Sequence, residues 1–251
     1  MANLSESTSP SIQQETGIVY LVGAGPGAVD LITVRGAKLL AQANIVLHDA
    51  LVTPEMLELC PQAIKISVGK RSGQRSAAQE HINQQLVEAA QQHAIVVRLK
   101  GGDPMLFGRA DEEMTTLEQA GIRFEIVPGI TTAMAAAASV KLPLTKRGVT
   151  RSVALFTSST APGEPAETRI PDCDTLVQYM GGKEAILTAQ RMLAKGFSAN
   201  LPIVIVESCS RPEEKHLHLT LADLAQGLTP SEGPVLVMMG EAMRLRFLER
   251  S

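Results

Sequence analysis

The chain of 251 residues has little of what builds nucleic-acid or metal sites. It has no tryptophan and only 3% aromatic residues, which argues against platforms for base stacking. Its net charge of -3 offers no basic footprint for nucleic acid. The three cysteines (Cys60, Cys173 and Cys209) are far apart and follow no Cys-x-x-Cys or Cys/His ligand spacing. We therefore expect no nucleic-acid partner, no metal and no disulfide framework.

Long hydrophobic runs are also lacking, and none approaches the roughly 18 to 20 residues that a membrane-spanning helix needs. Residues 1–16 are polar and rich in serine, without the charged and apolar segments of a signal peptide. We expect them to form a disordered tail on a cytoplasmic protein with reduced cysteines and no membrane partner. Hydrophobic residues make up 45% of the chain, which is enough for a sizeable core.

Short apolar runs alternate with helical patterns along most of the chain. Strands are predicted at residues 18–22, 45–47, 64–68, 95–99, 124–127, 153–157, 176–179, 203–206 and 235–239. Helices are predicted at residues 31–43, 76–91, 112–120, 183–195 and 220–226. This alternation predicts an α/β protein with mainly parallel sheets. We expect two α/β domains, residues 17–148 and 149–251, joined by a connection at 143–148.

A glycine-rich turn, Gly23-Ala24-Gly25-Pro26-Gly27-Ala28, follows the first predicted strand. It matches G-x-G-x-x-A, and Asp49 ends the second strand at a suitable distance. The pattern is typical of a dinucleotide site, so a nicotinamide-dependent oxidoreductase is one hypothesis. Pro26 argues against it, because proline has no N–H to offer a pyrophosphate.

The segment Lys100-Gly101-Gly102-Asp103-Pro104 ends the strand predicted at 95–99. Its glycines let a flat ligand approach the backbone, and Asp103 either accepts hydrogen bonds from that ligand or caps a turn. Arg109 lies just beyond and is either a solvated surface residue or an anion-binding one. The C-terminal edge of a parallel sheet is where ligands of α/β proteins bind.

Two further motifs follow strands. In Val127-Pro128-Gly129-Ile130-Thr131-Thr132-Ala133, the threonines stand at the start of an alanine-rich helix, where they cap it or touch a ligand. In Tyr179-Met180-Gly181, Met180 follows a strand of the second half and is either a core residue or a ligand contact.

Together with Val68-Gly69-Lys70-Arg71, these motifs resemble the uroporphyrinogen-III C-methyltransferases of the tetrapyrrole methylase family, from about Val19 to Glu241. The resemblance implies two α/β domains with S-adenosyl-L-methionine in the cleft between them, and a homodimer. It also implies two methylations of uroporphyrinogen III, at carbons 2 and 7. These would give precorrin-2 for siroheme or cobalamin biosynthesis and S-adenosyl-L-homocysteine as the second product.

The resemblance also assigns residues. It implies that Asp49 accepts a proton, that Lys70 donates one, and that Arg109, Glu112 and Arg147 bind the tetrapyrrole. Arg109 is a competing candidate for proton abstraction, but arginine is a poor base, so we prefer Asp49 and treat Arg109 first as a carboxylate clamp. The implied cofactor contacts are Pro26, Gly101, Gly102, Asp103, Leu106, Thr131, Thr132, Met180 and Cys209.

The sequence departs from the family pattern at several places. Ala50 replaces an arginine that often follows Asp49, Ala110-Asp111 replaces Gly-Gly, and Glu207-Ser208-Cys209 replaces a more usual Glu-x-Gly-Thr. These changes leave open a methylase of the same family acting on a later precorrin or another substrate, and a binding protein without catalysis. Because no dehydrogenase–ferrochelatase module precedes residue 17, we do not expect the multifunctional siroheme synthase.

Overall fold

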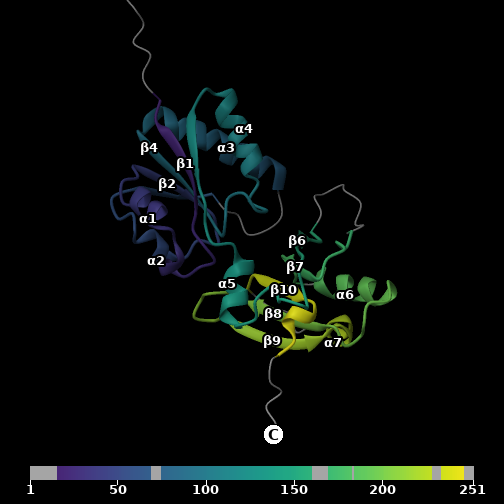
Figure 1. The fold of residues 1–251 in the computed structure, drawn as a ribbon. Coiled ribbons are helices and arrows are strands. Elements are labelled where there is room, and N and C mark those ends of the chain that lie inside the picture. Colours follow the sequence, from purple (N-terminus) through teal and green to yellow (C-terminus); the bar gives the residue numbers. More distant parts are fainter. Residues whose placement is uncertain (1–15, 69–74, 160–168, 183, 228–232, 246–251) are drawn as a thin grey trace, which may run out of the picture.

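The computed structural model describes residues 16–68, 75–159, 169–182, 184–227 and 233–245, and contains two five-stranded sheets, one below the other in Figure 1. All strands of the first sheet are parallel, as predicted, in the order β3-β2-β4-β1-β5. The strands are β1 (Ile18–Gly23), β2 (Ile45–His48), β3 (Ile64–Ser67), β4 (Ile95–Lys100) and β5 (Arg123–Val127).

Helices cover both faces of the first sheet, which explains why its central strands are almost continuously apolar. Leu86 and Leu117 pack on one face, from α3 (Arg75–Gln92) and α4 (Ala110–Gln119). Leu40 and Met56 pack on the other, from α1 (Val34–Leu40) and α2 (Pro54–Leu57). The helix predicted at 31–43 is divided into a 3₁₀ turn (Val29–Leu31) and α1, because the Thr33 hydroxyl caps α1 by accepting from Gly36 N at 3.1 Å.

The strand order also bears on the dinucleotide hypothesis. In the dinucleotide-binding fold the first strand lies directly beside the second. Here β4 lies between β1 and β2, so Asp49 at the end of β2 is not next to the glycine-rich turn after β1. The G-x-G-x-x-A pattern therefore lacks the structural context that a dinucleotide site requires.

The second sheet corrects the prediction of mainly parallel sheets. Its order is β6-β7-β10-β8-β9, and only β6 and β7 pair in parallel. The strands are β6 (Val153–Thr157), β7 (Thr175–Tyr179), β8 (Pro202–Glu207), β9 (Lys215–Thr220) and β10 (Val235–Met239). The sequence did not reveal β9, an exposed edge strand without an apolar run. Residues 208–214 between β8 and β9 are too few for a parallel crossover, so the two strands form an antiparallel hairpin.

The helix α5 (Thr132–Ser139) belongs to the core of the second sheet. Its buried Ala133, Ala136 and Ala137 form one cluster with Val204 and Met238. The helices α6 (Glu184–Ala194) and α7 (Leu221–Gln226) cover the opposite face. A 3₁₀ turn (Glu241–Met243) follows β10. Since α5 lies with the second sheet, we propose that the domains divide near residue 130 rather than at 148.

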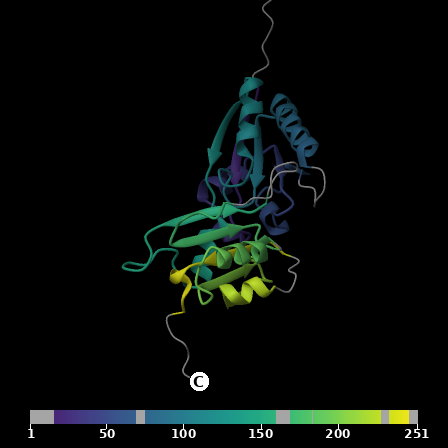
Figure 2. The ribbon, with the colours of Figure 1, turned by 90° about the vertical axis from the view of Figure 1, so that its right-hand side faces the viewer.

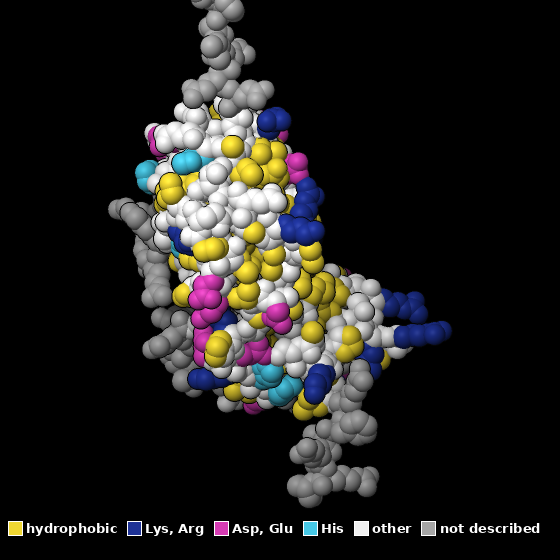
Figure 3. Space-filling model, turned by 90° about the vertical axis from the view of Figure 1, so that its left-hand side faces the viewer, with side chains coloured by type: hydrophobic (Ala, Val, Ile, Leu, Met, Phe, Trp, Pro, Cys, Tyr) yellow, Lys and Arg dark blue, Asp and Glu magenta, His cyan; other side chains and the backbone are white. Residues whose placement is uncertain are grey.

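The segment after α5 leads to β6 through a loop, residues 144–151, that projects from the body of the molecule (Figure 2). Paired backbone groups of Lys146 and Thr150 close this loop. Lys and Arg side chains gather on the projection at the right of Figure 3. Among the described residues, no helix has the length and apolar character that a bilayer crossing requires.

Candidate functional site

The carboxyl ends of β1, β4 and β5 meet through glycines whose backbones touch. Gly25 N donates to Gly102 O at 3.2 Å, and Gly102 N donates to Gly25 O at 2.7 Å. Both residues have positive φ, +75° and +69°, a region that glycine adopts without steric cost. A Cβ on Gly129 would overlap Gly102 O and lie 2.8 Å from Gly23 Cα. These glycines are required because three loops come together at backbone distance.

Asp103 holds two of these loops together. Its Oδ1 accepts from Met105 N at 2.8 Å, and its Oδ2 accepts from Gly129 N at 2.9 Å. The first bond is the turn cap that the sequence left as one alternative. The second bond fixes the Gly-Gly-Asp-Pro loop against the turn after β5. Asp103 therefore shapes the site through the backbone.

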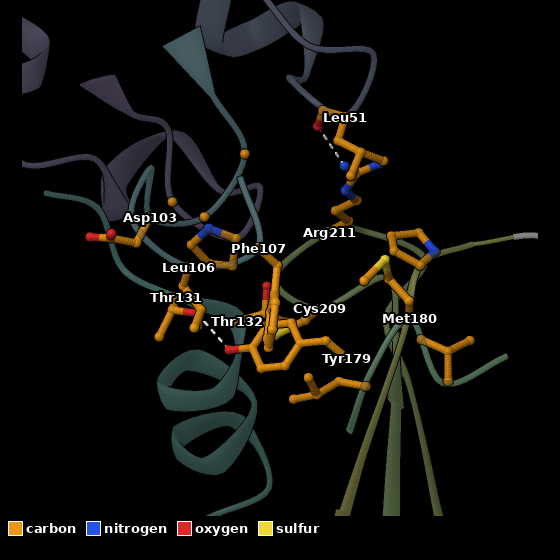
Figure 4. A pocket seen from close by; sticks show the side chains of 17 residues that line it. Leu51, Asp103, Leu106, Phe107, Thr131, Thr132, Tyr179, Met180, Cys209 and Arg211 are labelled. Atoms are coloured by element: carbon orange, nitrogen blue, oxygen red, sulfur yellow. Dashed lines mark hydrogen bonds between the residues drawn. The ribbon is translucent and has the colours of Figure 1, made fainter. Parts of the chain in front are cut away.

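An aromatic pair joins the two domains at this point. Phe107 lies in the loop after β4 and Tyr179 at the end of β7, with ring centroids 5.1 Å apart. The Tyr179 hydroxyl accepts from Ala133 N at 3.0 Å and lies 2.5 Å from Thr131 Oγ1 (Figure 4). Burial raises the pKa of Tyr179, so the phenol is neutral near pH 7. Thr131 is the N-cap residue of α5, but its side chain makes no capping hydrogen bond.

The loop after β8 closes the site from the second sheet. Ser210 Oγ accepts from Ala28 N at 3.0 Å, and Arg211 Nη2 donates to Leu51 O at 2.7 Å, so the loop is bonded to two turns of the first domain. Cys209 is buried in this loop. Burial first, and the nearby Glu214 carboxylate second, raise the pKa of the Cys209 thiol to about 12. The thiol is therefore protonated and unreactive near neutral pH.

Glu214 stabilises this loop from behind. It accepts hydrogen bonds from Ser210 N and Ser139 Oγ, and its Oε1 lies 2.5 Å from His216 Nε2. Burial alone would raise the pKa of Glu214, but these hydrogen bonds and His216 lower it below its usual value. Ser139, at the end of α5, is thus connected to the loop that bears Cys209.

These parts enclose a cavity of about 260 Å³ between the domains (Figure 4). Its lining is mainly apolar, with few polar groups, as is usual for small-molecule sites. The lining residues are Gly25, Pro26, Leu51, Gly101, Gly102, Asp103, Leu106, Phe107, Thr131, Thr132, Tyr179, Met180, Cys209, Arg211, Pro234, Val235 and Leu236. The set includes all nine residues at which the family resemblance places the cofactor.

The sequence reasoning did not assign some of the lining. Phe107 lies between the Gly-Gly-Asp-Pro motif and Arg109, and Tyr179 stands beside Met180, but neither aromatic residue was predicted to have a role. Arg211 carried no recognisable signal, and residues 235–236 were predicted as part of a strand but not as part of a site. Left-handed backbone, with φ from 49° to 60°, occurs in the surrounding loops at Phe107, Arg109, Met180, Ser208 and Ser210.

Asp49 lies outside this lining, at the end of β2, and is bound to a buried cluster of charges. Its Oδ1 is 2.5 Å from Arg98 Nη2, while Arg98 Nε and Lys100 Nζ each donate to Glu113 at 2.9 Å. The Asp49 side chain is 31% exposed, whereas that of Glu113 is fully buried. The sequence reasoning missed this cluster, although two cations in the apolar run of β4 were its signal.

The buried cations of this cluster are affected differently by their surroundings. Burial, and then the positive charge of Arg98, lower the pKa of Lys100. Burial also opposes the charge of Arg98, but the carboxylates of Asp49 and Glu113 more than offset this and raise its pKa. Arg98 thus remains a cation that donates to Asp49.

The residues expected to bind the tetrapyrrole lie outside the cavity lining. Arg109 donates from Nε and Nη2 to the two carboxylate oxygens of Glu112, at 2.6 and 2.7 Å. Hydrogen bonding to Glu112 raises the pKa of Arg109, which argues against a role as base. Arg147 is exposed in the projecting loop. Lys70 lies outside the described residues.

Two α/β domains with an apolar cavity between them agree with the fold that the resemblance implied. The family model described as Tetrapyrrole (Corrin/Porphyrin) Methylases matches residues 18–225. The chain therefore belongs to the tetrapyrrole methylase family, a family of methyltransferases. This assignment favours the methyl-donor interpretation of the glycine-rich turn over the dinucleotide one.

Solved structures support the same assignment. Uroporphyrin III C-methyl transferase from Thermus thermophilus is 37% identical, with a TM-score of 0.78 over 91% of this chain and 94% of that one. A second structure of that protein, with the same identity, coverage and TM-score, is a complex with S-adenyl homocysteine. A cobalt precorrin-4 methyltransferase is 28% identical, with a TM-score of 0.75 over 91% of this chain and 96% of that one.

Longer proteins also match. The siroheme synthase of Pseudomonas fluorescens (strain Pf0-1) is 41% identical over 237 residues, which is 92% of this chain and 51% of that protein. Siroheme synthase 2 of Yersinia pestis (strain Pestoides F) is 42% identical over 233 residues, which is 91% of this chain and 49% of that protein. The chain thus spans about half the length of these curated relatives.

Proposed function

We propose that this chain transfers methyl groups from S-adenosyl-L-methionine to carbons 2 and 7 of uroporphyrinogen III, giving precorrin-2 and S-adenosyl-L-homocysteine. The observation that carries the proposal is the interdomain cavity, which brings together all nine residues expected to contact the cofactor, from the five loops after β1, β4, β5, β7 and β8. A structural neighbour that is 37% identical was crystallised with the demethylated cofactor. The product would serve siroheme or cobalamin biosynthesis.

The cavity fits this chemistry by its size. A volume of about 260 Å³ is small for a ligand site and leaves no room for a macrocycle beside the methyl donor, so in this proposal the tetrapyrrole lies across the mouth of the cavity. A pyrrole carbon is electron-rich and attacks the methyl group, the carbon–sulfur bond breaks, and sulfur keeps the electron pair. Holding carbon, methyl and sulfur in line is the main requirement, and a rigid cavity supplies much of it through proximity and orientation.

Methylation leaves the pyrrole unit as a cation, which then loses a proton. We propose Asp49 as the acceptor, because its partly exposed carboxylate follows β2 two residues before Leu51 of the cavity lining. Arg98 would orient this carboxylate through the 2.5 Å contact. Lys70 remains the proposed proton donor. For the acidic macrocycle we propose contacts with Arg109, Glu112 and Arg147, with Arg109 as a cationic clamp.

The test is incubation of the protein with uroporphyrinogen III and S-adenosyl-L-methionine. We expect a product with two added methyl groups by mass spectrometry. The Asp49→Asn variant should lose turnover while calorimetry shows unchanged affinity for S-adenosyl-L-homocysteine. Methylation of a later precorrin alone would reassign the substrate, whereas cofactor binding without turnover on any tetrapyrrole would contradict an enzyme. Binding of NAD in place of S-adenosyl-L-homocysteine would revive the oxidoreductase hypothesis.

We also infer, from the family resemblance, that the chain acts as a homodimer in the cytoplasm. Sedimentation analysis should give twice the mass of the chain. A monomer with full activity would contradict the dimer.

A further inference from the structure

Arg211 is a lining residue with a buried hydrogen-bond donor that has no partner in the described protein. Its Nη2 donates to Leu51 O at 2.7 Å, but its buried Nε finds no acceptor among the described residues. A guanidinium carries five N–H donors, and a buried donor without a partner is costly. A ligand that accepts from Nε would remove this cost.

Arg211 differs from Arg98 and Arg109 because those two arginines form ion pairs with carboxylates. Arg98 is bound to Asp49 and Glu113, and Arg109 is bound to Glu112. Within the described part of the chain, no carboxylate lies within ion-pair distance of Arg211. Its guanidinium can therefore take a carboxylate without displacing one that is already bound.

The distribution of charge on the cavity lining also favours Arg211 as the group that binds an anion. The fully charged side chains among the lining residues are Asp103 and Arg211. The carboxylate of Asp103 is held by Met105 N and Gly129 N. In Figure 4, Arg211 lies beside Leu51, on the side of the cavity opposite Asp103. The positive charge of the lining is thus supplied by one residue of the second domain.

Arg211 is also bonded to the turn that follows the proposed proton acceptor, Asp49. The guanidinium is bonded to the carbonyl of Leu51, two residues after Asp49, and its stem packs on Gly27, where an added Cβ would approach Arg211 Cγ to 3.0 Å. The residue between Asp49 and Leu51 is Ala50, whose side chain brings no charge. Among the lining residues, the cation beside Leu51 therefore comes from the second domain.

We propose that Arg211 binds a carboxylate of the bound ligands, through Nε and a terminal nitrogen. The guanidinium fork matches a carboxylate in two parallel hydrogen bonds. This inference rests on the proposed function, in which both ligands carry such groups: eight on uroporphyrinogen III and one on the methyl donor. Arg211 is a specificity-determining residue for whichever carboxylate it binds.

The test uses Arg211→Gln and Arg211→Lys in the full chain, with Arg123→Gln as control, because Arg123 is exposed on the edge strand β5. Calorimetry gives the Kd of S-adenosyl-L-homocysteine and of 5′-deoxy-5′-(methylthio)adenosine, which lacks the amino-acid carboxylate. Initial rates give KM and kcat for uroporphyrinogen III. Thermal melting verifies that each variant is folded, and Arg211→Lys, which keeps the charge, provides a second reading if Arg211→Gln unfolds.

We expect Arg211→Gln to raise the KM for uroporphyrinogen III about tenfold or more, with Arg211→Lys between it and the wild type. Unchanged affinity for S-adenosyl-L-homocysteine would then assign the carboxylate to the macrocycle. A tenfold loss for S-adenosyl-L-homocysteine, but not for the methylthioadenosine, would assign it to the donor.

Two results would overturn the inference while the proposed function stands. One is unchanged KM and Kd in both Arg211 variants. The other is an equal loss for all three ligands, the methylthioadenosine included, because this would mean that Arg211 only shapes the cavity. A wild-type chain that binds no S-adenosyl-L-homocysteine and methylates no tetrapyrrole would instead overturn the proposed function and this inference together.

Discussion

The two domains contribute to the cavity in different ways. The first supplies all the glycines of the lining, Gly25, Gly101 and Gly102, whose backbone faces the cavity where loops after parallel strands come into contact, together with apolar side chains. The second supplies side chains, of which Tyr179 and Arg211 are bonded across to other elements. The positions of the backbone groups depend on the close packing of the glycines. The positions of the side chains depend on the hydrogen bonds that fix Tyr179 and Arg211. Substitutions should therefore act differently on the two sides.

The largest effect on stability is expected in the first domain, at Glu113. Glu113→Gln removes the buried carboxylate that faces Arg98 and Lys100, and breaking a buried ion pair costs about 3–5 kcal/mol in the free energy of unfolding. Glu112→Gln is the matched control, because its ion pair with Arg109 is exposed and is worth about 1 kcal/mol or less. Urea unfolding measures both, and equal losses would contradict the role of the buried cluster.

Gly129→Ala should be the next most damaging change. The added Cβ overlaps Gly102 O, so the loops must separate, at a cost of about 3 kcal/mol, the upper end for overpacking. Affinity for S-adenosyl-L-homocysteine should fall with it. Gly182→Ala is the control, because a Cβ there has nothing within 4 Å and should change stability by about 0.5 kcal/mol or less. Full binding by Gly129→Ala would show that close packing of these loops is unnecessary.

In the second domain, Tyr179→Phe removes the hydroxyl and keeps the ring, so it distinguishes the contributions of the two groups. Loss of the hydroxyl leaves Ala133 N without its acceptor, at a cost of about 1–2 kcal/mol in the free energy of unfolding. The ring contact with Phe107 remains, so cofactor affinity should change less than in Tyr179→Leu. Thermal melting and calorimetry measure the two effects. Equal binding losses in both variants would mean that the ring itself contributes nothing.

The smallest effect concerns pH and Glu214. The pKa of this carboxyl is lowered in the folded chain, so its contribution to stability is present above the ordinary value of 4.5 and is lost as pH falls through the folded pKa. Glu214→Gln should therefore be less stable than the wild type at neutral pH, and the difference in Tm should shrink below pH 4.5. Melting curves from neutral pH to about pH 3.5 measure it. A difference that is constant with pH would contradict the lowered pKa.

The same contrast explains what the sequence could predict of the fold. The central strands of the first sheet, β1, β2 and β4, are mostly apolar and buried, so their pattern indicated a parallel sheet, and the structure confirms it. The edge strand β9 alternates lysine and histidine with leucine and has little burial to mark it. Without β9 the hairpin with β8 was invisible, and the second sheet was wrongly predicted to be mainly parallel.

Predictability of the site follows a similar division. Clustered glycines, as in Gly101-Gly102 and Gly25-Pro26-Gly27, are visible in a sequence because only glycine permits such backbone contact. Arg211 gives no such signal, since its place at the rim results from a hairpin loop reaching across to Leu51. Lys100 belongs to the Lys-Gly-Gly-Asp-Pro motif, but its pairing with Glu113 depends on how α4 packs on the sheet.

The left-handed residues around the cavity have a consequence for stability. Phe107, Met180, Ser208 and Ser210 each hold a backbone conformation that costs a non-glycine residue about 1 kcal/mol or more. The folded protein carries this strain before any ligand arrives. A loop conformation that is fixed by the fold before a ligand enters lowers the conformational entropy that binding must lose. The strain of these loops therefore lowers the free energy of unfolding in return for a preorganised site.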